Sequence, residues 1–343
     1  MTHSTTADII TAGKSALQTE LADHIGAGAG DGSTVEANAE ALRRCRLVPS
    51  VAVGVGKPST NTQFLGIELD LPVMTAPMGP LELIDSQGAL TVSQAASTAG
   101  AATTIALTSA PVLEEAIAPS GAGFFQLYWW GDRDWIQSML SRAERARYGA
   151  IVITVDVPDY GTRWADVRNG FDHHGQMTLP NLTDAAQSRA ERLDFQRALT
   201  FADIAWAVEA ADIPIILKGV LSGKDARRAI DAGVDSIYVS NHGGRALSGQ
   251  VATMDALGEV ASEVGGEVPI IVDGGFSTAE DVAKGLARGA DLVAIGRPIA
   301  YALAAGGASG VEQYLQLLKD DFRTALTVLG ASSPGQLGPD HLR

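Results

Sequence analysis

Short apolar runs rich in β-branched residues alternate with helical patterns along the chain from about residue 70 onward. Most runs are apolar at successive positions, which is typical of parallel strands covered by helices on both faces. Eight runs are predicted to be strands: residues 72–76, 103–107, 124–128, 151–155, 215–218, 236–239, 270–272 and 292–295. Helices are predicted between them, for example over residues 91–99, 135–146, 223–232 and 278–288, with Ser222 and Ser277 as the expected N-caps of the last two.

Eight consecutive strand–helix units predict an α/β fold of the (β/α)8 type, a TIM barrel. A doubly wound open sheet is the alternative, although it usually has fewer strands and an early glycine-rich turn. Residues 1–65 are expected to form an N-terminal helical extension that covers the bottom of the barrel or reaches round to its mouth, and residues 66–343 the barrel itself. Residues 311–329 predict one amphipathic helix, and the polar segment 169–183 predicts a long functional or mobile loop.

Composition narrows the possible partners and compartment. The formal charge of -15 argues against a nucleic-acid partner and against adsorption to an anionic membrane. Cys45 is the one cysteine, so neither an intrachain disulfide nor a cysteine metal cluster can form. No apolar stretch approaches the ~18 residues of a membrane span, and the first residues lack the pattern of a signal peptide. We therefore expect a cytoplasmic protein.

The segment after the sixth predicted strand carries the strongest candidate chemistry. Residues 240–248 have the sequence SNHGGRALS, which places a titratable base, glycines and a fixed cation at the end of a strand. His242 can take a proton near neutral pH, and the planar guanidinium of Arg245 suits a carboxylate or phosphate. Because active sites of (β/α)8 enzymes lie at the C-terminal ends of the strands, this segment is a candidate active site.

Other strand ends add polar side chains to the same mouth. Arg163 and Arg245 are expected to converge on a substrate carboxylate; separate salt bridges with acidic neighbours such as Asp156 or Asp166 are the alternative. Asp156 could instead orient His242. Two further side chains, Tyr128 and Lys218, have two interpretations each: substrate contact or packing for the tyrosine, and ligand contact or a buried carboxylate partner for the lysine.

Glycines after the last two predicted strands indicate a phosphate site. Asp273, Gly274 and Gly275 follow one strand, and Gly296 and Arg297 follow the other, so backbone N–H groups and one cation could approach an anion. Ordinary barrel turns are the alternative. The histidines at 24, 173 and 174 show no metal-ligand spacing with carboxylates, and no metal site is predicted.

Several segments in order resemble the FMN-dependent α-hydroxy-acid oxidase and dehydrogenase family, which includes glycolate oxidase, lactate oxidase, mandelate dehydrogenase and hydroxymandelate oxidase. The resemblance extends from about residue 23 to about residue 329. Its most specific motif is SNHGGRAL at 240–247, close to the family's SNHGGRQL. Similar segments are FFQLY at 124–128, TVD at 154–156, LKGV at 217–220, DGG at 273–275 and IGRP at 295–298.

The resemblance implies a role for each matching residue. His242 would be the base that takes the α-hydroxyl proton, with Asp156 as its partner. Arg163 and Arg245 would hold the substrate carboxylate, and Tyr128 would contact the substrate oxygens. The residues implied at FMN are Pro77, Met78, Gly79, Ala106, Gln126, Thr154, Lys218, Ser240, Asp273, Gly274, Gly275, Ser277, Gly296 and Arg297.

Departures from the family pattern concern the substrate and the phosphate. His24 stands where the family has a substrate-contacting tyrosine, so the resemblance implies that it contacts an unusual substrate group; a merely tolerated replacement is the alternative. Ser277 replaces a phosphate-binding arginine. Gly79 and Thr108 replace larger residues, which together with Trp129 and Trp130 favours a bulky or aromatic (S)-2-hydroxy acid over glycolate.

The expected reaction yields a 2-oxo acid, with O2 or a quinone-like acceptor reoxidising FMN. A specialised enzyme for a natural-product intermediate and a flavin-binding protein without turnover are the alternatives. By analogy with relatives, a homotetramer is expected.

Overall fold

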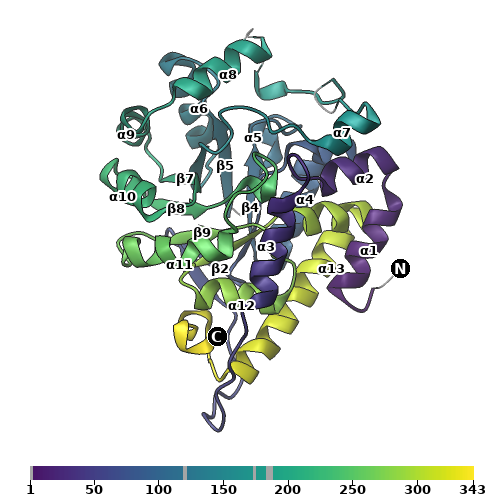
Figure 1. The fold of residues 1–343 in the computed structure, drawn as a ribbon, viewed down its shortest axis with the longest axis vertical. Coiled ribbons are helices and arrows are strands. Elements are labelled where there is room, and N and C mark those ends of the chain that lie inside the picture. Colours follow the sequence, from purple (N-terminus) through teal and green to yellow (C-terminus); the bar gives the residue numbers. More distant parts are fainter. Residues whose placement is uncertain (1–2, 119–121, 173–174, 183–187) are drawn as a thin grey trace.

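Eight parallel strands close into a barrel in the computed structural model, which describes residues 3–118, 122–172, 175–182 and 188–343 (Figure 1). The closed order β10-β3-β4-β5-β6-β7-β8-β9 confirms the (β/α)8 prediction and excludes the open doubly wound sheet. All eight predicted strands are present, with ends shifted by at most two residues. Their bounds are β3 Val73–Thr75, β4 Ala102–Ala106, β5 Gly123–Tyr128, β6 Ala150–Thr154, β7 Ile215–Val220, β8 Ser236–Val239, β9 Ile270–Val272 and β10 Leu292–Ile295.

Helices surround this barrel, and further helices lie before its first strand and after its last strand in the sequence. The barrel helices are α4 Gly88–Ala99, α5 Leu113–Ala116, α6 Arg133–Arg145, α7 Trp164–Asn169, α8 Arg189–Ala198, α9 Phe201–Ala210, α10 Gly223–Asp231, α11 Thr253–Val264 and α12 Ala279–Ala287. Ser222 caps α10 as expected, but Thr278 rather than Ser277 caps α12, because Asp281 at the third helical position completes a capping box with Thr278.

Two predicted segments differ from the structure. The C-terminal helix α13 spans Arg297–Leu329, much more than residues 311–329, and Gly306 and Gly307 interrupt its helical backbone. The segment between β6 and β7 contains α7, α8 and α9, and the predicted loop 169–183 begins on the last residue of α7 and includes a short 3-10 helix at Pro180–Leu182. Of the predicted loop 169–183, residues 173, 174 and 183 lie outside the described residues, and the two predicted loop histidines are among them.

A hairpin closes the end of the barrel opposite the site. Its strands, β1 Thr62–Phe64 and β2 Ile67–Leu69, pair antiparallel. Phe64 packs in the barrel-interior cluster with its ring 6.0 Å from that of Phe124, the second residue of β5. Burying a phenylalanine of this kind contributes about 1.5–3 kcal/mol. The expected helical extension therefore also contains a strand, and the predicted boundary at residue 65 lies within the turn of this hairpin.

The N-terminal helices α1 Thr6–Ala16, α2 Thr19–Gly26 and α3 Ser33–Arg44 reach the mouth of the barrel. α1 and α2 lie beside α13 in Figure 1. Asn38 on α3 exchanges two amide hydrogen bonds with buried Asn241, at 2.9 and 2.8 Å. A Cβ at Gly244 would lie 2.8 Å from the backbone nitrogen of Val35, so glycine is needed where α3 meets the loop after β8. Among the described residues, no helix is long and apolar enough to cross a membrane.

Candidate active site

The loop after β8 presents His242 at the C-terminal end of the barrel, next to Asp156. His242 and the two following glycines adopt positive φ angles of 57°, 62° and 75°, which turns the chain sharply as it leaves the strand. The Nδ1–H of His242 donates to Oδ1 of Asp156 at 2.9 Å. This hydrogen bond fixes the tautomer whose Nε2 carries a lone pair, so that Nε2 can accept a proton.

Lys218 of β7 lies between two buried carboxylates, Asp156 after β6 and Asp273 after β9. Its Nζ is 3.7 Å from Oδ2 of Asp156 and 3.9 Å from Oδ2 of Asp273, and it donates to Oγ of Ser240 at 2.9 Å. The side chain is about 4% exposed. Tyr128 of β5 and Thr154 of β6 occupy the matching register positions beside it. The lysine therefore both pairs with buried acids and lines the cavity, which unites its two sequence-based interpretations.

The two carboxyls respond differently to this lysine. Burial alone would raise the pKa of Asp156, but the charge of Lys218 and the hydrogen bond from His242 outweigh it and hold the pKa below its usual value of 3.8. Burial dominates at Asp273 and raises its pKa despite Lys218 and Ser240. Asp156 is therefore the ionised partner at neutral pH, suited to stabilising a positively charged imidazole.

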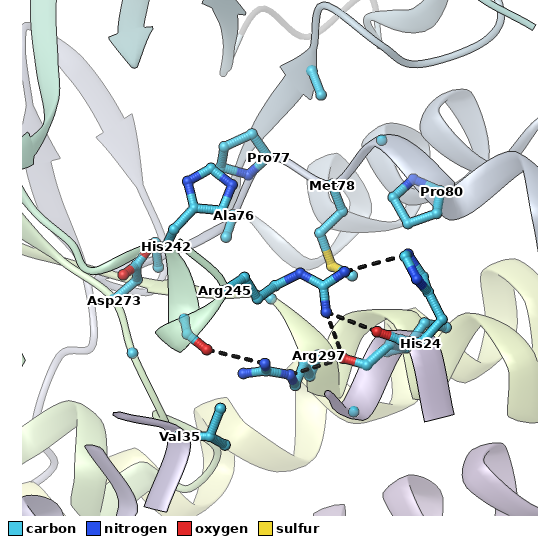
Figure 2. A pocket seen from close by; sticks show the side chains of 18 of the residues that line it. His24, Val35, Ala76, Pro77, Met78, Pro80, His242, Arg245, Asp273 and Arg297 are labelled. Atoms are coloured by element: carbon cyan, nitrogen blue, oxygen red, sulfur yellow. Dashed lines mark hydrogen bonds between the residues drawn. The ribbon is translucent and has the colours of Figure 1, made fainter. Parts of the chain in front are cut away.

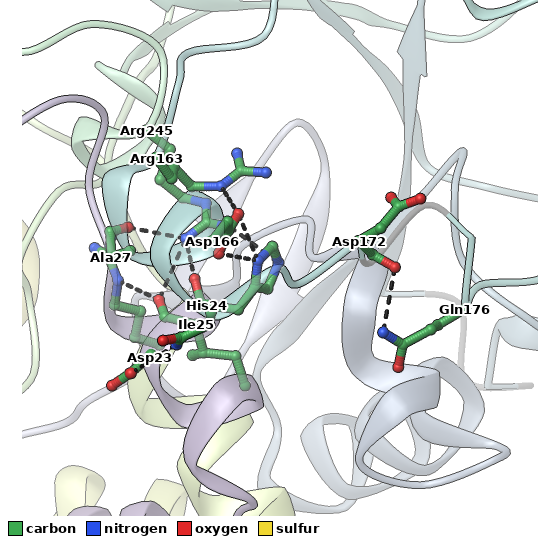
Figure 3. Close-up of polar contacts among 11 residues, drawn as sticks. Asp23, His24, Ile25, Ala27, Arg163, Asp166, Asp172, Gln176 and Arg245 are labelled. Atoms are coloured by element: carbon green, nitrogen blue, oxygen red, sulfur yellow. Dashed lines mark hydrogen bonds and ion pairs between the residues drawn. The ribbon is translucent and has the colours of Figure 1, made fainter.

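Two arginines and an aspartate meet at His24, which is 1% exposed (Figure 3). Nε of Arg163 donates to Asp166 at 2.6 Å, so the salt bridge considered as an alternative is present. The same carboxylate accepts Nδ1–H of His24 at 3.0 Å, and Nη2 of Arg245 lies 3.3 Å from Nε2 of His24. Burial, together with the charge of Arg245, lowers the pKa of His24 to about 4, so the ring is neutral at pH 7.

The carbonyl groups at the end of α2 hold two guanidinium groups at once (Figure 2). Nη1 of Arg245 donates to the carbonyls of His24 and Ala27 at 2.7 and 2.9 Å. Arg297 donates to Ile25 and Ala27 at 2.9 and 3.1 Å and to the carbonyl of Gly243 at 3.0 Å. The negative end of the helix dipole favours cations here. Arg297, expected at a phosphate, thus also joins α2 to the loop after β8.

A cavity of about 480 Å³ opens between these groups. All of the residues expected at FMN line it except Thr154 and Ser240, which are buried at its edge. Nε2 of Gln126 and Oγ1 of Thr154 are buried without a hydrogen-bond partner among the described residues. Such groups need partners that a bound molecule can supply, and an isoalloxazine ring offers hydrogen-bonding atoms on its edge. The side chains and the glycine-rich turns after β9 and β10 therefore fit FMN.

Comparison with known proteins agrees with this fit. Residues 13–343 match the sequence profile of the FMN-dependent dehydrogenase family. The chain belongs to this family. It is 39% identical over 345 residues to 4-hydroxymandelate oxidase of Amycolatopsis orientalis, covering 98% of this chain and 97% of that protein. It is 36% identical to the peroxisomal (S)-2-hydroxyacid oxidase GLO3 of Arabidopsis thaliana, covering 96% and 93%.

Solved structures extend the comparison to the fold. A crystal structure of mandelate oxidase superposes with a TM-score of 0.92 at 37% identity, covering 100% of this chain and 98% of that one. The predictions of the family, of an FMN-dependent 2-hydroxy-acid oxidase or dehydrogenase and of FMN as cofactor are confirmed. The roles of the individual residues remain predictions.

The sequence does not reveal two contributions to the site, and it suggests one residue near the substrate that the structure places elsewhere. The sequence suggests Asp166 only as a salt-bridge partner of an arginine, yet its carboxylate also links Arg163 to His24. Nothing in the local pattern around Asn38 shows that α3 reaches the loop after β8, where this side chain binds Asn241. Trp129, expected near the substrate, packs edge-on against Trp206 and does not line the cavity.

Proposed function

We propose that this protein oxidises an (S)-2-hydroxy acid with a bulky or aromatic side chain to the corresponding 2-oxo acid, with O2 or another acceptor reoxidising FMN. The observation that carries this proposal is the cavity in which His242, oriented by Asp156, lies together with Arg163 and Arg245. A base and two cations suit a molecule that carries a hydroxyl next to a carboxylate. Mandelate-type relatives support the aromatic side chain.

The proposed reaction removes two electrons and two protons from the substrate. Nε2 of His242 accepts the α-hydroxyl proton, and the ionised Asp156 stabilises the imidazolium that results. FMN, when bound, would supply the acceptor for the two electrons and for the hydrogen on the α-carbon, which accounts for the second proton. Tyr128 lines the cavity, and burial raises the pKa of its hydroxyl, so it remains a hydrogen-bond donor for a substrate oxygen.

The two arginines explain why the substrate should be an acid. Burial and the charges of Arg163 and Arg297 lower the pKa of Arg245 well below its usual value. Cations that repel each other in a buried site are stabilised by an anion placed between them. Asp166 supplies one negative charge to this group, and a substrate carboxylate would supply a second.

Aromatic and flexible side chains line the part of the cavity proposed for the substrate's own side chain. Trp130 stacks on Tyr128 with ring centroids 4.6 Å apart and planes 10° from parallel. Thr108, Met177 and Tyr160 line the same cavity. A phenyl ring would gain dispersion and stacking contacts here that the hydrogen atom at the same place in glycolate cannot make.

An anaerobic substrate screen tests this function. We expect mandelate and 4-hydroxymandelate to bleach the bound flavin at least about tenfold faster than glycolate or lactate, since burying a ring against Trp130 contributes well over 1.4 kcal/mol. Readmission of air then distinguishes an oxidase from a dehydrogenase by the rate at which flavin absorbance returns. Equal rates with glycolate would contradict the aromatic substrate. A flavin that no 2-hydroxy acid bleaches would favour a specialised enzyme or a protein without turnover.

Gly79 and Thr108 are expected to act as a matched pair. A Cβ at residue 79 would clash with Oγ1 of Thr108 and lie 3.2 Å from Cε of Met177. We expect Gly79→Ala to lower the free energy of unfolding by about 1–3 kcal/mol through overpacking. Thr108→Ala removes the clashing atom and should restore most of that loss in the double variant. Urea unfolding of the two single variants and the double variant measures this; simple additivity would show that the two residues are independent.

A further inference from the structure

His24 is connected to both arginines that the proposed function places at the substrate carboxylate, to Arg245 directly and to Arg163 through Asp166. Its Nδ1–H donates to Asp166, which holds Nε of Arg163. Its Nε2 accepts from Nη2 of Arg245, and its carbonyl accepts from Nη1 of the same guanidinium at 2.7 Å. His24 thus links the two arginines: Nδ1 leads through Asp166 to Arg163, while Nε2 and the backbone carbonyl both bind Arg245.

The contacts of His24 decide which edge of Arg245 is available. A guanidinium has two edges that can bind a carboxylate with parallel hydrogen bonds, one made of Nη1 and Nη2 and the other of Nη2 and Nε. His24 takes the first edge with its carbonyl and Nε2, and the carbonyl of Ala27 takes another Nη1 hydrogen. Among the described residues, Nε and the second Nη2 hydrogen make no hydrogen bond. The second edge is therefore left for a ligand.

This arrangement requires a neutral imidazole with its hydrogen on Nδ1. A hydrogen on Nε2 would point at the donor Nη2 of Arg245 and replace an attraction with a repulsion. Asp166 selects the correct tautomer because an ionised carboxylate only accepts hydrogen bonds. Burial and the neighbouring cation keep the ring uncharged at neutral pH.

We propose that His24 is a positioning residue that turns the Nε–Nη2 edge of Arg245 toward the substrate carboxylate and couples Arg245, through Asp166, to Arg163. The inference rests on the proposed function, because it concerns how the same site recognises an acid. His24 need not contact the substrate itself. Its two ring nitrogens are already engaged, and Phe171 covers the ring at a centroid distance of 5.0 Å.

Ligand binding to the FMN-loaded enzyme tests this role separately from turnover. The probes are benzoylformate, which carries a carboxylate, and 2-hydroxy-2-phenylacetamide, which has a neutral amide in its place. Their dissociation constants are measured from the perturbation of flavin absorbance. His24→Phe keeps a ring but loses both side-chain hydrogen bonds. His24→Asn keeps an amide N–H for Asp166 but cannot reach Arg245, and it provides a second variant if the first does not fold.

For both variants we expect benzoylformate to bind at least about tenfold more weakly, with amide binding changed less than about threefold. KM for the acid should rise by a similar factor, with kcat within about threefold of the wild type. Phe171→Leu is the matched control: it alters packing on the same ring without removing a polar contact and should affect acid and amide equally.

Two results would overturn the proposal: unchanged benzoylformate binding in both variants, or equal loss for acid and amide. Failure of the proposed function is seen separately, in a wild-type enzyme whose flavin no 2-hydroxy acid bleaches.

Discussion

Replacing His242 with alanine is expected to slow anaerobic bleaching of the flavin by substrate on the order of 10²–10⁴-fold, the range that general base catalysis contributes. FMN should remain bound, because the side chains that fit the flavin edge, Gln126 and Thr154, lie on β5 and β6 and are unchanged. Stopped-flow absorbance measures the rate, and the flavin content of the purified variant measures binding.

Two further variants make this experiment specific. Asp156→Asn retains the base but offers Nδ1 an amide N–H, which favours the tautomer with hydrogen on Nε2 and so blocks the proposed acceptor atom. Asp156→Asn should therefore also bleach the flavin much more slowly than the wild type. His341→Ala removes a histidine from a short helical turn near the C-terminus, far along the chain from the site, and should leave bleaching unchanged. A His242→Ala variant that bleaches at the wild-type rate would exclude this residue as the base.

The barrel could be predicted from sequence because its strands differ so clearly from their surroundings. Residues such as Ile151 and Ile216 belong to strands that begin with three or four successive apolar residues, and parallel strands buried on both faces favour this pattern. The hairpin around Phe64 could not be predicted in the same way. Its two strands have three residues each, alternate with polar side chains and become stable only by closing the barrel.

The site could be predicted as a set of side chains but not as a network. The position of His242 after a buried strand and the presence of Asp156 after another were enough to pair them. The environment of His24 was not predictable, because its partners Asp166 and Arg245 are 142 and 221 residues away. Local pattern carries no information on such distant contacts until the fold brings α2 to the barrel mouth.

Replacing Lys218 with methionine should lower the free energy of unfolding by about 3–5 kcal/mol, as expected when one partner of a buried ion pair is removed. The substitution leaves Asp156 and Asp273 close together in a buried site without the cation between them. The double variant Lys218→Met/Asp273→Asn should recover part of the loss, because only one carboxylate then remains uncompensated. Urea unfolding measures all three proteins, both free of FMN and at one fixed FMN concentration, since a bound cofactor adds to stability.

Two further measurements test whether the loss in Lys218→Met arises from the buried carboxylates: the pH dependence of the free energy of unfolding, and the same substitution at a surface lysine. In the wild type the pKa of Asp156 is held below 3.8, so its contribution to stability is present above that pH and is lost as pH falls through the lowered pKa. In Lys218→Met, burial raises this pKa, so the loss of unfolding free energy should be largest near neutral pH and shrink as the carboxyls become protonated.

Lys319→Met is the surface control. It breaks a shorter contact of 2.9 Å with Asp70, whose side chain is 56% exposed, and should lower the free energy of unfolding by less than about 1 kcal/mol. Equal losses for the two lysines, or a deficit at Lys218 that does not change with pH, would contradict the role assigned to the buried carboxylates.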